Sequence, residues 1–217
     1  MTTVWGPLGW MTLHSVASCY PESPSQAERN LMSSWLDMFR DTITCPHCRE
    51  HFTSMLAIYR AMFPNMLQSR QEFCLFTFRA HNAVNRRLNK PMYTTVEECL
   101  TTLQTNVKTR SAKEYRAAYF SHILQNWSAY RDATGFSALK KILELRKIDA
   151  DYIQPRDTNF DISLPSDVVV LPRNVLERGA TGLEEARPTQ GLAGTLQSVT
   201  NPRVGIRFTA QGLRLRR

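Results

Sequence analysis

The sequence has no apolar run long enough to cross a membrane. No stretch of about 18 consecutive hydrophobic residues occurs in the 217-residue chain, so a membrane-spanning helix is not expected. The first residues, MTTVWGPLGWM, contain no basic segment followed by an apolar core, and they are not rich in arginine. Such a start resembles neither a secretory signal nor a transit peptide, and we therefore expect a cytoplasmic protein.

Cysteine is scarce, and the five cysteines cannot all be paired. In a chain without a recognisable signal peptide, this argues against a framework of structural disulfides. It gives weight instead to a redox or metal-binding role for Cys45 and Cys48, which form a CxxC motif in TITCPHCREHF.

The charged residues show no strong local concentration. The formal net charge is +8, but the basic side chains are scattered along the chain. This distribution favours a solvated basic surface over a nucleic-acid interface, and we do not expect nucleic acid as a partner. Hydrophobic residues make up 42% of the chain, enough for a packed core.

Apolar residues recur at helical spacing over the first hundred residues. The pattern predicts helices at 8–18, 23–43, 46–59 and 69–88, followed by a short helix that begins near Thr95. Ser23 and Pro24 are the expected cap and first-turn proline of the second helix. Several amphipathic helices with brief connections indicate an all-α bundle.

The chain changes character twice after this bundle. Residues 106–150 continue the helical pattern, with a break expected at Gly135 before a helix at 137–146. An aromatic and apolar stripe runs along this extension: Tyr115, Tyr119, Ile123, Trp127 and Tyr130. Residues 151–217 are rich in Pro, Gly, Thr and Arg and contain no Lys. We expect residues 1–105 to form the first domain, 106–150 a helical extension, and 151–217 an extended tail that orders only against a partner.

A CxxC at the start of a helix is the arrangement of a redox pair. The spacing allows the two sulfurs to bond, and the partial positive charge at the helix N-terminus stabilises a thiolate. Pro46 in the first turn and His47 between the cysteines fit this arrangement.

Two other interpretations of the motif remain open from the residues alone. Cys45, Cys48 and His51 are plausible zinc ligands, although a structural site needs a fourth ligand that the sequence does not identify. CPHC also occurs in thioredoxin-like oxidases, but that fold needs a strand before the motif, whereas helical patterns flank it here.

Two further segments place polar and aromatic residues on helical faces. In HNAVNRRLNK, His81, Asn85 and Leu88 share one face, and buried amide and imidazole groups would need hydrogen-bond partners. In WGPLGWMTLHSVASCYP, Trp10 and His14 are four residues apart. Such a lining on several helices suits a planar heteroaromatic ligand.

These three segments, in this order, resemble the Erv/ALR family of FAD-dependent sulfhydryl oxidases over about residues 4–105. The resemblance implies a four-helix bundle with a short fifth helix, a homodimer, and FAD bound between helices. It also implies oxidation of dithiols in protein substrates to disulfides, with O2 as electron acceptor and hydrogen peroxide as product.

The resemblance assigns roles to individual positions. Cys45 is similar to the sulfur that exchanges with substrate thiols, and Cys48 to the one that faces the flavin. The implied FAD-binding positions are Gly6, Trp10, His14 and Tyr20 in the first segment and His81, Asn82, Val84, Asn85, Leu88, Lys90 and Tyr93 in the second. No metal is implied.

This chain departs from the family pattern in several ways. The structural disulfide that often encloses the HN motif is absent, because Phe78 and Thr95 occupy its positions. No distal shuttle pair is present, and we expect Cys19, Cys74 and Cys99 to be buried apolar residues. The chain is similar in this respect to compact members from large cytoplasmic DNA viruses, which would place it in host cytoplasm or virions. The alternative function is a virion component in which residues 106–217 bind a protein assembly such as a capsid.

Overall fold

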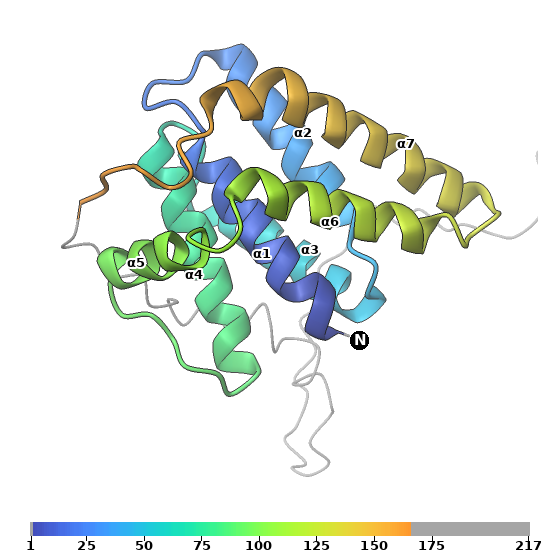
Figure 1. Ribbon diagram of the computed structural model, residues 1–217, viewed down its shortest axis with the longest axis horizontal. Coiled ribbons are helices and arrows are strands. Elements are labelled where there is room, and N and C mark those ends of the chain that lie inside the picture. The colour runs from blue at the N-terminus through green and yellow to red at the C-terminus, as the bar shows by residue number, and fades with distance from the viewer. Residues whose placement is uncertain (1, 166–217) are drawn as a thin grey trace, which may run out of the picture. The chain divides into compact units, whose positions relative to one another are not determined.

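The computed structural model describes residues 2–165 and shows a helical protein (Figure 1). Its helices are α1 (Thr2–Ser18), α2 (Gln26–Thr42), α3 (Pro46–Met62), α4 (Arg70–Arg87), α5 (Val96–Asn106), α6 (Ala112–Trp127) and α7 (Ala133–Ile148). A π-helical turn, Asp149–Ile153, and a 3-10 turn, Gln154–Arg156, follow α7. The predicted all-α bundle is confirmed. No helix within residues 2–165 combines the length and apolarity needed to span a membrane.

Polar caps explain where most of these helices begin. Ser69 and Thr95 accept hydrogen bonds from the third backbone N–H of α4 and α5, close to the predicted starts. The expected cap at Ser23 was wrong, because Ser25 caps α2. Ser25 and Glu28 form a reciprocal capping box: the Ser25 hydroxyl accepts from the Glu28 N–H, and the Glu28 carboxylate accepts from the Ser25 N–H.

The predicted break at Gly135 was also wrong. Asp132 caps α7, and Gly135 lies inside its first turn, where its N–H donates to the Asp132 carboxylate. A Cβ at Gly135 would collide with the backbone carbonyl of Tyr130. The glycine therefore permits a close backbone approach within the helix and does not end one.

The helices share one core. Its largest fully buried side chains include Trp35 on α2, Tyr59 on α3, and Phe73 and Phe76 on α4. At about 25 cal/mol per Å² of buried apolar surface, aromatic side chains of this size dominate the stabilisation of the bundle.

The extension packs on the first two helices. In Figure 1, α6 runs beside α1 and α7 lies along α2. Tyr119, Ile123 and Trp127 of the predicted stripe are buried there, whereas Tyr130 is 54% exposed. The domain boundary near residue 105 stays a prediction, but α6 contributes to the same hydrophobic core as α1–α5.

The start of the predicted tail is anchored on the helices. Ile153 and Phe160 are buried, and the backbone carbonyl of Phe160 accepts a hydrogen bond from Gln104 of α5. Residues 166–217 of the predicted tail lie outside the described residues.

Candidate flavin and disulfide site

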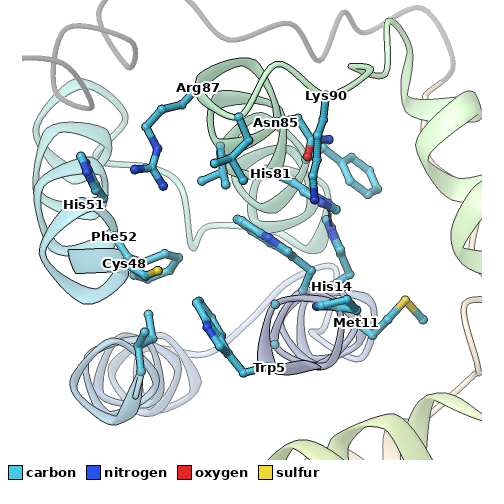
Figure 2. A pocket seen from close by; sticks show the side chains of 18 of the residues that line it. Trp5, Met11, His14, Cys48, His51, Phe52, His81, Asn85, Arg87 and Lys90 are labelled. Carbon is cyan, nitrogen blue, oxygen red and sulfur yellow. Dashed lines mark hydrogen bonds between the residues drawn. The ribbon is translucent and has the colours of Figure 1, made fainter. Parts of the chain in front are cut away.

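A single cavity of about 710 Å³ brings together most of the predicted site residues. It lies between α1, α3 and α4 and is closed by residues of α5 and of the loop before it (Figure 2). Ligand pockets in proteins typically measure about 300–1,000 Å³, so this cavity has the size expected for a large organic ligand. The predicted residues that line it are Gly6, Trp10, His14, Cys45, Cys48, His81, Val84, Asn85, Leu88, Lys90 and Tyr93.

The cysteine pair lies at the end of the cavity formed by α3. Cys45 and Cys48 form a disulfide, with their Cα atoms 5.2 Å apart. Cys45 is the N-cap of α3, and its Sγ accepts a hydrogen bond of 3.3 Å from the Cys48 backbone N–H. Figure 2 shows the Cys48 side chain directed from α3 into the cavity beside Phe52. The helix start can therefore stabilise a thiolate where the cavity meets the surface.

Trp10 and two histidines form the inner wall. The rings of Trp10 and His81 are stacked, with centroids 4.3 Å apart and planes at 9°. His14 Nε2 lies 3.0 Å from His81 Nδ1, and His14 Nδ1 lies 3.0 Å from Thr77 Oγ1. Burial lowers the pKa of both imidazoles, to about 4 for His81, so both rings are neutral near pH 7.

Cationic side chains lie at the far end of α4. Arg87 and Lys90 both line the cavity, and Figure 2 shows Arg87 reaching toward the helix that carries Cys48. Asn89 adopts a positive φ of 53°, and the Lys90 N–H then donates to the Asn85 carbonyl. This turn ends α4 and returns the chain to the cavity, where the two cations can balance anionic groups of a ligand.

Two of the predicted positions lie outside the cavity lining. Tyr20 is fully buried, and its hydroxyl donates to the Leu67 carbonyl. Asn82 holds the segment after α4 in place, since its side chain both accepts from the Tyr93 N–H and donates to the Tyr93 carbonyl. Asn82 thus positions Tyr93, which does line the cavity.

Several lining residues escaped the sequence analysis. Trp5 and Phe78 supply aromatic surface, and Arg87 supplies charge. The Trp5 indole N–H is buried and has no hydrogen-bond partner among the described residues. A signal was present in the composition, because Trp5 and Trp10 belong to the same aromatic-rich segment.

The other cysteines lie apart from the disulfide. Cys19, Cys74 and Cys99 are free and buried, as predicted. Burial raises the pKa of Cys19 to about 11 and of Cys99 to about 12, and raises that of Cys74 further, which keeps the thiols protonated.

The competing interpretations of CxxC gain no support from this geometry. Among residues 2–165, no three His, Cys, Asp or Glu side chains cluster as metal ligands would. The motif is flanked by α2 and α3, whereas a thioredoxin-like site would follow a strand.

Comparisons with known proteins specify the class of this helical bundle with a disulfide at a cavity of about 710 Å³. The Erv1 / Alr family profile matches residues 8–110. A provisionally named FAD-linked sulfhydryl oxidase, 096R of Invertebrate iridescent virus 3, is 36% identical over 88 residues, covering 41% of this chain and 58% of that protein. The FAD-linked sulfhydryl oxidase of African swine fever virus is 36% identical over 86 residues, covering 40% of this chain and 69% of that protein.

A cellular protein matches a stretch of similar length. The mitochondrial FAD-linked sulfhydryl oxidase ERV1 of Saccharomyces cerevisiae is 33% identical over 88 residues, covering 41% of this chain and 44% of that protein. No solved structure matches the chain significantly. The chain belongs to the Erv1 / Alr family, as its motifs predicted. It spans a little over half of the iridescent virus relative and about two thirds of the swine fever virus relative.

Proposed function

We propose that this chain is a FAD-dependent thiol oxidase. It oxidises dithiols in protein substrates through the Cys45–Cys48 disulfide and passes the electrons by way of FAD to O2, with hydrogen peroxide as product. The observation that carries the proposal is the disulfide at the N-terminus of α3, opening into an aromatic cavity of about 710 Å³. The names of the viral and yeast relatives agree with this activity and cofactor.

The residues present fit FAD. The stacked Trp10 and His81 rings offer flat surfaces for a heteroaromatic ring, and Arg87 and Lys90 offer positive charge for a diphosphate. Trp5 lines the cavity, and its buried indole N–H has no hydrogen-bond partner among the described residues.

Thiol exchange at Cys45 starts the reaction. A substrate thiolate attacks Cys45 Sγ, the Cys45–Cys48 bond breaks, and its electron pair moves to Cys48 as a thiolate. A second substrate thiolate attacks the substrate sulfur of the mixed disulfide and releases Cys45 as a thiolate. The Cys48 backbone N–H at the helix start donates a hydrogen bond to Cys45 Sγ and can stabilise this charge. The Cys45 and Cys48 thiolates then re-form their S–S bond and give up two electrons. Bound FAD would supply the two-electron acceptor that passes these electrons to O2. The two protons of the substrate thiols balance the hydrogen peroxide formed.

The purified protein tests this function directly. It should carry a visible flavin absorbance band and consume O2 when given dithiothreitol. Cys48→Ser should abolish O2 consumption and retain flavin, whereas Cys74→Ala, which replaces a buried cysteine that does not line the cavity, should retain both. A colourless wild-type protein, or an unaffected rate in Cys48→Ser, would contradict the proposal.

The proposal also includes the oligomeric state of the protein and its location in the cell. We infer a homodimer in host cytoplasm or virions, with residues 106–217 able to contact a protein assembly. Light scattering of the purified full-length chain tests the dimer, and cross-linking in infected cells tests the assembly contact. A monomer that cross-links to no virion protein would contradict both.

A further inference from the structure

Three side chains from α1 and α4 form a row of hydrogen bonds that ends at the cavity. Thr77 Oγ1 lies 3.0 Å from His14 Nδ1, and His14 Nε2 lies 3.0 Å from His81 Nδ1. Thr77 and His14 are buried, whereas His81 is partly exposed and lines the cavity. In such a row, all the hydrogen bonds can be donated in one direction or all in the other. The direction decides whether the free nitrogen of His81 is a donor or an acceptor for a ligand.

The hydroxyl of Thr77 sets the direction. Its Oγ1 lies 2.8 Å from the carbonyl oxygen of Cys74, one turn earlier in α4. Two oxygens at this distance repel unless a proton lies between them, and the carbonyl has none to give. The single Thr77 proton therefore points to Cys74, and Oγ1 is left as an acceptor for His14.

The rest of the row follows from the chemistry of neutral imidazole. His14 Nδ1 must carry the ring proton that Thr77 accepts, which leaves His14 Nε2 as an acceptor. His81 Nδ1 must then donate to His14 Nε2. The remaining nitrogen, His81 Nε2, carries no proton and has no hydrogen-bond partner among residues 2–165.

We propose that Thr77 is a positioning residue that fixes both rings as Nδ1–H tautomers, so that His81 presents an unprotonated Nε2 to the cofactor. Such a nitrogen selects an N–H donor, for example a ring N–H or an exocyclic amino group of a flavin dinucleotide. The reversed row would present an N–H and select an acceptor. The identity of the ligand rests on the proposed function, whereas the tautomers are a property of this chain alone.

The tautomers are measurable in the full-length protein as purified with its flavin. Two-bond ¹H–¹⁵N correlation spectra at pH 7 of ¹⁵N-histidine-labelled protein should show protonated Nδ1 and unprotonated Nε2 for both His14 and His81. Protonated Nε2 on both rings would overturn the assignment. The result holds whether or not the protein turns over thiols, so a failure of the proposed activity and a failure of this inference are separate outcomes.

Substitutions at Thr77 test its positioning role. Thr77→Val keeps the shape and removes the hydroxyl, whereas Thr77→Ser keeps the hydroxyl. In the valine variant, His14 should no longer be held in one tautomer. The dissociation constant for flavin should rise about 5-fold, which corresponds to the loss of about 1 kcal/mol for one hydrogen bond. The serine variant should restore both.

Thr12 provides a matched control on α1. Its hydroxyl is buried and makes no hydrogen bond among the described residues. Thr12→Val should therefore change neither the histidine spectra nor flavin affinity. Equal spectra and equal affinities for Thr77→Val and Thr77→Ser would refute the role of Thr77, and should the valine variant fail to fold, the wild-type spectra still decide the proton direction.

Discussion

Replacing Arg116 with Met should destabilise the protein more than any surface substitution. Arg116 lies on α6 with no exposed surface, and its guanidinium contacts three groups. Its Nε pairs with Asp149, its Nη1 lies 2.8 Å from Asp157, and Nη1 also donates to Ser15 on α1. One side chain thus ties the segment after α7 to the helix that carries His14.

The magnitude follows from the burial of the partners. The Asp149 and Asp157 side chains are only 8% and 12% exposed. Removing the guanidinium leaves two carboxylates with little access to water, and breaking a buried pair in this way typically costs about 3–5 kcal/mol. For a protein of this size, each kcal/mol lowers Tm by about 2–4 °C, so the expected decrease is roughly 6–20 °C.

Thermal unfolding followed by circular dichroism measures the effect. Arg131→Met, at an exposed arginine in the loop before α7, is the matched control and should shift Tm by no more than about 2 °C. Adding Asp149→Asn and Asp157→Asn to Arg116→Met should recover part of the loss, because no uncompensated charge then remains. An Arg116→Met protein that melts within about 2 °C of wild type would refute the reasoning.

Three further predictions concern the site. Cys45→Ser should abolish turnover of dithiols while flavin absorbance is retained, and a variant with near wild-type O2 consumption would exclude Cys45 from the exchange. Replacing the three free cysteines together with Ala should leave substantial activity on small dithiols, since all three are buried with raised pKa values; a folded, flavin-bound but inactive triple variant would reveal a relay through Cys19, Cys74 or Cys99. Burial, with a smaller contribution from Lys90, lowers the pKa of His81 from 6.5 to about 4. Between these values the unfolded chain binds a proton that the folded chain does not, so stability should fall as pH falls from about 6.5 to about 4. Urea unfolding across this range should show a weaker pH dependence in His81→Gln, and an identical dependence would contradict the assignment.

Helix periodicity and the site motifs could be read from the sequence because both depend on near neighbours along the chain. Apolar residues at every third or fourth position identified the bundle, and CxxC placed the two disulfide-bonded cysteines at a helix start. Local signals failed where two neighbours competed for one role. Ser25, which forms a capping box with Glu28, caps α2 in place of Ser23. Gly135 permits a close backbone approach to Tyr130 that no spacing rule shows.

Only the tertiary structure decided which distant residues meet. His14 and Thr77 are 63 positions apart, and their contact fixes the direction of the hydrogen bonds that reach His81. Trp127 of the extension donates to the Thr42 carbonyl, 85 positions away, at the end of the helix before the disulfide. Sequence motifs name the chemical groups of a site, but their protonation, burial and charge depend on partners that chain folding brings together. The sequence by itself therefore determined the helices, the cysteine pair at the start of α3 and the family. The cavity, the histidine row and the anchoring of the extension by Arg116 came from packing.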